Sequence, residues 1–131
     1  MKHDSFLLKV AACLGFLAIG LGAFGAHGMK GKWDALPNRK ESAHREEVWR
    51  TAAQYHLIHS VALLALALAG ASRRFVLAGR CWITGIIVFS GSLYLFAFTG
   101  IKQFGAVTPF GGLFLMAGWL ALLVRFGEKK T

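Results

Sequence analysis

Four long apolar stretches constrain this chain more than any other feature of its sequence. They cover roughly residues 6–26, 51–71, 82–101 and 107–126 of the 131 residues. Each has the length of about twenty residues that an α-helix needs to cross the hydrocarbon core of a bilayer. The mean hydropathy of +0.53 and the hydrophobic content of 56% are far above those of a soluble domain. The sequence therefore predicts an all-α polytopic membrane protein, a compact bundle of four transmembrane helices with one domain over residues 1–131.

Two sequence signals indicate where helices begin. Thr108 followed by Pro109 is typical of an N-cap and the first helical position, which needs no backbone N–H, so we expect the fourth span to start there. Asn38 followed three residues later by Glu41 resembles a capping box. This second signal predicts a helix from about residue 39 that runs unbroken into the second span.

The first connection, residues 27–50, is rich in charge. It carries six basic and four acidic residues, together with Trp33 and Trp49, which are suited to anchoring at the level of lipid headgroups. We expect an amphipathic interfacial segment here, between the first and second helices. A solvated loop is the alternative.

Small residues recur at the spacing of one helix face on three of the predicted spans. Glycine and alanine at such positions let helix backbones approach closely. We expect them to fill the interior of the bundle, and homo-oligomerisation through these Gly/Ala faces is the alternative. The residues are Ala11, Gly15, Ala18, Gly22, Gly25, Ala65, Ala69, Gly111 and Gly118.

The net charge of +9 does not indicate a nucleic-acid partner. Its lysines and arginines lie in short segments between apolar stretches and form no single basic stripe. Membrane lipids with anionic headgroups are the expected partners. Cys13 and Cys81 are expected at different depths, so both are interpreted as reduced packing residues.

The distribution of Lys and Arg gives little bias for orientation, with eight on the side of the termini and seven on the other. We expect a protein that crosses the inner (plasma) membrane of a bacterium several times. Both termini are expected on the cytoplasmic side, because the basic segments near them are short and close to the span ends.

Polar side chains of the four spans are predicted to gather near one membrane face. With alternating span directions, the end of the first span, the start of the second, the end of the third and the start of the fourth share one side. The predicted polar cluster consists of His27, Gln54, Tyr55, His59, Tyr94, Thr99 and Thr108. Such groups need partners inside a bilayer, because each unpaired one costs several kcal/mol.

We interpret His27, Tyr55 and His59 as a hydrogen-bonded network that joins helices, with Gly28 as a left-handed cap after the first span. The sharper alternative is a metal or haem site that uses His27, His56 and His59. All six acidic residues lie outside the spans, which disfavours carboxylate-driven transport. No catalytic constellation is recognised, and no cofactor is predicted.

Four motifs together resemble a known family. LGAFGAHG (21–28), TAAQYHLIHS (51–60), FSGSLYLFAFTG (89–100) and VTPFGGLFLMAGWL (107–120) are similar to the small inner-membrane family of unknown function typified by YgdD. The resemblance covers nearly the whole chain. It implies an integral membrane protein of about four helices, with no established activity or cofactor.

The sequence thus predicts a non-enzymatic structural, binding or accessory membrane protein with a His/Tyr cluster near one face. A metal- or haem-binding redox component and a transporter of small solutes or lipids are the alternatives.

Overall fold

The computed structural model describes residues 3–124. Four helical segments in this range are long and apolar enough to cross a membrane, as predicted: Ser5–Gly28, Arg39–Ala69, Arg73–Thr99 and Lys102–Leu123. They are built from α1 (Ser5–Ala23), the π-helical turn Phe24–Gly28, α3 (Arg39–Ala69), α4 (Arg73–Gly85), the π-helical turn Ile86–Ser90, α5 (Gly91–Thr99) and α6 (Lys102–Leu123). A short helix, α2 (Lys30–Asp34), lies in the first connection.

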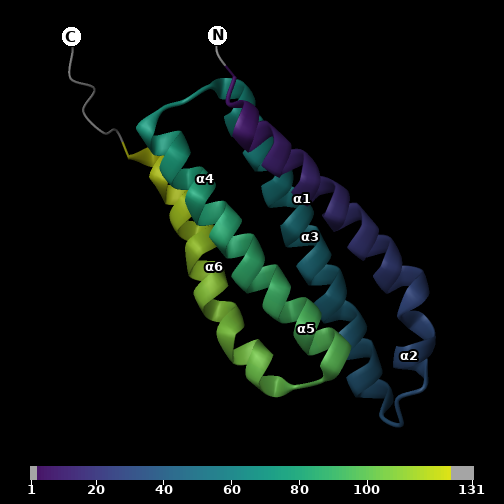
Figure 1. Cartoon of the computed structure of the whole chain (residues 1–131). Helices are drawn as coiled ribbons and strands as arrows, with labels where there is room; N and C mark the ends of the chain where they lie inside the picture. The colour runs from purple at the N-terminus through teal and green to yellow at the C-terminus, as the bar shows by residue number, and fades with distance from the viewer. Residues whose placement is uncertain (1–2, 125–131) are drawn as a thin grey trace, which may run out of the picture.

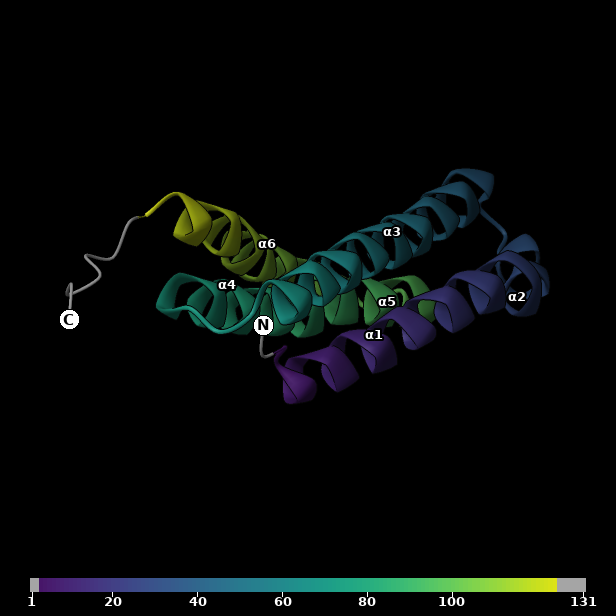
Figure 2. The same cartoon turned by 90° about the horizontal axis from the view of Figure 1, so that it is seen from above.

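The four segments run alternately up and down (Figure 1). Helix α1 packs along α3, and the continuous segment α4–α5 lies between α3 and α6. Viewed from above, α3 and α6 lie toward one side and α1 toward the other, with α4–α5 between them (Figure 2). The start of α1 and the end of α6 lie at one end of the bundle, and α2 lies at the other.

Side-chain caps fix where α1 and α3 begin. The carboxylate of Asp4 accepts a hydrogen bond from the N–H of Leu7 at 3.0 Å. The side chain of Asn38 accepts from the N–H groups of Lys40 at 2.9 Å and Glu41 at 3.4 Å. The predicted helix from residue 39 through the second span is therefore confirmed, because α3 is unbroken from Arg39 to Ala69.

The last two spans start earlier than predicted. The Ser72 hydroxyl accepts from the N–H of Phe75, so α4 begins at Arg73 and not near 82. Helix α6 begins at Lys102, which places Pro109 inside the helix and not at its first position. The predicted start of the third span followed hydrophobicity alone, and that of the fourth relied on the Thr108–Pro109 signal, whereas both helices begin before the apolar run. The predicted end of the fourth span at 126 lies outside the described residues.

The end of the first span was also predicted wrongly. The chain passes through the π-helical turn Phe24–Gly28, closed by the N–H of Met29 on the carbonyl of Phe24, and continues into α2. Gly28 does not have the positive φ of a left-handed cap; within the described range only Gly70 and Gly100 do. In this wider turn, main-chain N–H groups pair with the last carbonyls of the helix, which a left-handed cap would otherwise have to satisfy.

Helix α3 presents one continuous buried face to the rest of the bundle. Buried positions follow one another at alternating steps of three and four residues, the spacing of helices packed at a shallow angle. They are Ser42, Arg45, Trp49, Ala52, His56, His59, Leu63 and Leu66. The buried face is apolar at the end far from α2 and becomes more polar toward α2. It therefore determines where the polar side chains of the bundle meet.

Several of the predicted small residues allow close contact within the chain. A Cβ at Gly25 would overlap the Trp49 indole, one at Gly118 would overlap Trp82, and one at Gly111 would overlap the backbone of Phe89. Ala11 and Ala18 are buried. The second span differs, because Ala65 and Ala69 are exposed on α3.

Candidate functional site

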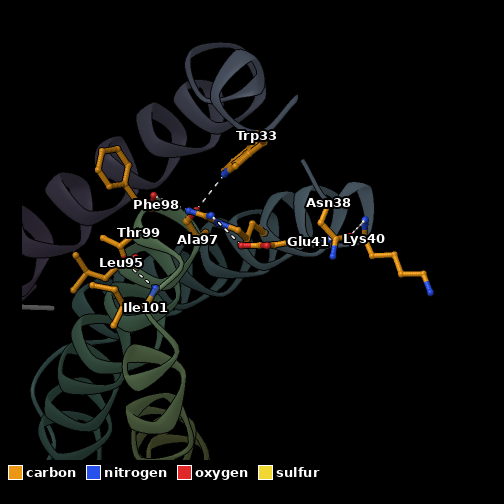
Figure 3. Close-up of polar contacts among 10 residues, drawn as sticks. Trp33, Asn38, Lys40, Glu41, Leu95, Ala97, Phe98, Thr99 and Ile101 are labelled. Atoms are coloured by element: carbon orange, nitrogen blue, oxygen red, sulfur yellow. Dashed lines mark hydrogen bonds and ion pairs between the residues drawn. The ribbon is translucent and has the colours of Figure 1, made fainter. Parts of the chain in front are cut away.

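The carbonyl of Ala97, near the end of α5, is a junction of three helices. It accepts one hydrogen bond from Trp33 Nε1 on α2 at 3.1 Å and another from Arg45 Nε on α3 at 3.0 Å. Arg45 Nη2 also donates to the carbonyl of Phe98 at 2.9 Å. Figure 3 shows the Trp33 indole directed at Ala97. Two long side chains therefore attach the first connection to the far end of the third span.

Arg45 acts as a cap for α5. The last carbonyls of a helix lack backbone partners and carry partial negative charge, so a guanidinium is well placed there. The Arg45 residue is 6% exposed, and Nη1 faces Glu41 at 3.4 Å. Gly100 follows with a φ of 74°, and a Cβ there would lie 3.0 Å from Nη1 of Arg45. The glycine therefore provides both the left-handed turn and the room for the guanidinium.

The two tryptophans of the first connection are buried, contrary to the prediction of headgroup anchors. Trp33 is 1% exposed and Trp49 is 5% exposed. Trp49 Nε1 donates to the carbonyl of Leu21 at 2.7 Å, and its ring packs 4.7 Å from that of Tyr94. Because each indole N–H has a carbonyl partner inside the protein, these rings are core residues.

His56 and Tyr94 join α3 to α5. His56 Nδ1 lies 3.3 Å from the Tyr94 hydroxyl, and the histidine is 5% exposed. Its other nitrogen, Nε2, is buried without a hydrogen-bond partner among the described residues. Either tautomer of the neutral ring leaves one unsatisfied polar atom here, which costs about 1–3 kcal/mol.

His59 joins α3 to α6. Trp119 Nε1 donates to His59 Nε2 at 3.1 Å, and His59 Nδ1 lies 2.7 Å from the carbonyl of Tyr55. Because Nε2 accepts, the neutral ring carries its proton on Nδ1 and donates it to Tyr55. The Trp82 and Trp119 rings each pack edge-on to the imidazole, about 6 Å between centroids. Both nitrogens of His59 are therefore occupied.

Hydroxyl groups make further junctions deeper in the bundle. Ser90 Oγ donates to the carbonyl of Ala52 at 2.8 Å, between the third and second spans. Ser92 Oγ and Thr108 Oγ1 lie 2.7 Å apart, between the third and fourth. Thr99 bonds its own helix, since its hydroxyl donates to the carbonyl of Leu95 at 2.6 Å.

Three members of the predicted cluster, His27, Gln54 and Tyr55, are exposed. Tyr55 and His59 do meet, through the main-chain carbonyl of Tyr55 at 2.7 Å and through rings stacked at 6.2 Å. His27 makes no hydrogen bond or ring contact with either within residues 3–124, so the predicted network of all three does not form. Gly25 packs against Trp49. His27 lies two residues beyond Gly25 toward α2 and His59 lies ten residues beyond Trp49 in the opposite direction, so they differ in depth by about 18 Å. The prediction had placed both histidines at the same depth near one membrane face.

The histidines of the alternative metal site do not converge. No group of three His, Cys, Asp or Glu side chains among residues 3–124 is arranged to hold a metal ion. His27 is exposed at the end of the first span, and His59 uses both ring nitrogens in hydrogen bonds. His56 Nε2 alone of the three predicted ligands is buried and unpartnered.

A pocket of about 330 Å³ lies beside the buried tryptophans, between the end of α1, α2 and α3. Gly22, Gly25 and Ala53 form small-residue walls. Its charged rim consists of Lys30, Glu46 and Arg50, where Arg50 pairs with Glu46 at 3.5 Å and Lys30 with Asp34 at 3.6 Å. The pocket is amphipathic, as a lipid-facing site at the end of a bundle would be.

Sequence reasoning missed Arg45, Trp82 and Trp119 as members of these junctions. Arg45 could have been found by extending the buried spacing of α3 backward, since it precedes Trp49 by four residues and Ala52 by seven. No comparable signal marks Trp119, whose ring is 48% exposed. Its role depends on the packing of α6 against α4, which the sequence does not specify.

The comparisons with known proteins agree with this architecture. Residues 21–112 match the family described as "Protein of unknown function (DUF423)". The chain belongs to this family. It is 40% identical over 126 residues to the UPF0382 membrane protein YwdK of Bacillus subtilis, covering 89% of this chain and 95% of the relative.

Relatives are not confined to bacteria. A UPF0382 membrane protein of Schizosaccharomyces pombe, C1782.12c, is 35% identical over 121 residues, or 88% of this chain and 97% of its own. A Haemophilus influenzae UPF0382 membrane protein is 35% identical over 127 residues, or 95% and 94%. No solved structure matches. The protein is thus an integral membrane protein of a family without an established activity.

Proposed function

We propose that this protein is a non-enzymatic structural, binding or accessory component of the bacterial inner membrane, with YgdD-like proteins among its relatives. The observation that carries the proposal is how the buried polar side chains are used. Trp33, Arg45 and Trp49 donate to main-chain carbonyls of other helices, and so do Trp82 and Ser90. These hydrogen bonds hold helices together, so the buried donors are used for structure.

The end of the bundle that carries α2 is the part we expect to meet a partner. Hydrogen bonds fix Trp33 to α5 and Trp49 to the end of α1, so α2 and the first turns of α3 are held rigidly. A rigid surface loses little conformational entropy on binding. Membrane lipids are the first expected partners, and the pocket beside Trp49 is their expected contact at this end.

Self-association is a further property proposed for such a component. The small residues of α1 face α3, where Gly15 and Gly22 lie near Ser60 and Ala53. The exposed Ala65 and Ala69 on α3 therefore remain as the small-residue surface for a homo-oligomer.

We also propose that both termini are cytoplasmic. At the end of the bundle where α1 begins, Lys9, Arg73, Arg74 and Arg80 lie in short basic segments close to the span ends. Basic residues so placed favour the cytoplasmic side.

Metal analysis and an absorption spectrum of the purified full-length protein test the non-enzymatic assignment. We expect substoichiometric metal and no visible absorption. A Soret band, or copper or zinc at one equivalent that His56→Ala removes while His44→Ala retains it, would replace the assignment with the redox alternative. His44 is the control because its ring packs on Phe96 at 5.8 Å, away from His56.

A further inference from the structure

At the end opposite α2, a groove separates α1 from α4. A cavity of about 240 Å³ lies between the start of α1, the end of α3 and the first turns of α4. A second hollow of about 420 Å³ follows the outer face of α4, and the two share Val76 and Arg80. The walls of the first are mainly apolar: Leu7, Leu66, Phe75, Val76 and Ile83.

Arg80 is the cation at the junction of the two hollows. Its side chain is exposed, and within residues 3–124 it makes no hydrogen bond or ion pair. It follows Arg73, where α4 begins, by seven residues, so it lies about 10 Å along the helix from that end. A guanidinium at this depth on a spanning helix needs an anionic partner or water.

The acidic residue of the groove is already used elsewhere. Asp4 lines the same cavity, but its carboxylate caps α1 by accepting the N–H of Leu7 at 3.0 Å. It forms no ion pair with Arg80. The described residues therefore offer Arg80 no counter-charge.

The depth of Arg80 agrees with that of another cation. Leu7 and Gly79 are in contact, since a Cβ at Gly79 would lie 3.8 Å from the Leu7 side chain. Lys9 on α1 and Arg80 on α4 each lie within two residues of this contact and are both exposed. Two cations at one level are typical of the headgroup region, where long basic side chains reach lipid phosphates.

We propose that this groove is a binding site for one anionic phospholipid, whose phosphate pairs with Arg80 and whose acyl chain lies along the apolar wall between α1 and α4. Arginine is suited to phosphate because its planar guanidinium donates two parallel hydrogen bonds. A lipid with a net negative charge fits better than a zwitterionic one, because Lys9 and Arg80 bring two positive charges to this level and neither has an ion pair with a described carboxylate. This site is separate from the α2 end, so it does not depend on the function proposed above.

Native mass spectrometry of the full-length protein in detergent tests the site, with phosphatidylglycerol as the probe and phosphatidylcholine as the comparison. We expect one retained phosphatidylglycerol, and Arg80→Gln to weaken its binding about tenfold or more. Arg74→Gln is the matched control, because Arg74 lies over the Phe75 ring at 5.1 Å and lines neither hollow. The control should bind as the unmodified protein does.

A second variant tests the acyl-chain part of the groove. Val76 is 41% exposed and lines both hollows, so Val76→Trp should fill the groove and also prevent retention of the lipid. Val61→Trp, at a position 58% exposed on α3, is its control. Equal retention of phosphatidylglycerol by Arg80→Gln and the unmodified protein would overturn the proposal. So would equal retention of phosphatidylcholine, displacement by millimolar inorganic phosphate, or a second protein copy found in place of the lipid.

Discussion

The indole N–H of Trp119 donates to Nε2 of His59 at 3.1 Å, and this hydrogen bond joins the fourth span directly to the second. In the view of Figure 1, α4–α5 lies between these two helices. Trp82 lies between them, with its ring 4.7 Å from that of Trp119 and its own N–H on the carbonyl of Leu115 at 3.2 Å. One imidazole thus connects three spans through aromatic packing and a single acceptor nitrogen.

A double-mutant cycle measures the strength of this connection. His59→Leu and Trp119→Phe should each destabilise the protein by about 1–3 kcal/mol, because each leaves a polar partner unpaired away from water. The coupling between them should be about 0.6 kcal/mol, in the range measured for side-chain hydrogen bonds within membranes. Thermal unfolding in detergent gives the values.

The control for this cycle uses Tyr55. His59 bonds the main-chain carbonyl of Tyr55, and the phenol ring is 41% exposed. Tyr55→Phe should therefore be nearly neutral and additive with His59→Leu. Additivity of His59→Leu with Trp119→Phe as well would show that their hydrogen bond contributes nothing to stability.

Arg45→Lys tests the α5 cap. Lysine keeps the charge but cannot reproduce the fork that donates to the carbonyls of Ala97 and Phe98, at 3.0 and 2.9 Å. We expect a loss of about 1.5–3 kcal/mol in unfolding free energy, the range for hydrogen bonds that involve a charged group. Arg50→Lys is the matched control, since that side chain is 74% exposed and its pair with Glu46 is long at 3.5 Å. Equal stability of the two variants would contradict the cap.

Gly25→Ala tests the close approach of α1 and α3. A Cβ at position 25 would overlap the Trp49 indole, whose N–H is fixed on the Leu21 carbonyl at 2.7 Å. The ring cannot move without losing that bond, so we expect a loss of about 1–3 kcal/mol from overpacking. Gly20→Ala lies on the same helix with nothing within 4 Å of its Cβ. It should instead stabilise the protein by about 0.5–1 kcal/mol, and a drop in melting temperature as large as that of Gly25→Ala would contradict a specific contact.

Hydrophobicity in the sequence was sufficient to predict the helices and their alternation, because the bilayer requires about twenty apolar residues per span. It was insufficient for the helix limits. Helices α4 and α6 extend into charged or glycine-containing segments, where Ser72 and not the apolar boundary determines the start of α4. Asn38 was recognised because its cap has a local signature.

The site was predicted less well, because it depends on which faces of the helices meet. Spacing along α3 places Tyr55 and His59 on adjacent turns, but it does not show that the partly exposed Tyr55 packs on Phe89 and that His56 meets Tyr94. The carbonyl of Ala97 could not be expected at all from a side-chain inventory. Main-chain carbonyls at a helix end can be recognised as hydrogen-bond acceptors only when the positions of the neighbouring helices are known.

The pair of His56 and Tyr94 provides a test that separates a structural role from a ligand-binding one. Removing one partner leaves the other buried and unpaired, so His56→Leu and Tyr94→Phe should each destabilise the protein, by about 1–3 kcal/mol. The double variant also removes the orphaned Nε2 of His56, which no described group satisfies. Its stability should therefore return to within about 1 kcal/mol of the unmodified protein, because replacing both partners by apolar groups of similar shape is nearly neutral. Chemical denaturation of all four proteins in one detergent provides the comparison. If the double variant loses the sum of the two single effects, His56 Nε2 has a stabilising partner in the folded protein, and a bound ligand or ion at that nitrogen becomes the explanation to pursue.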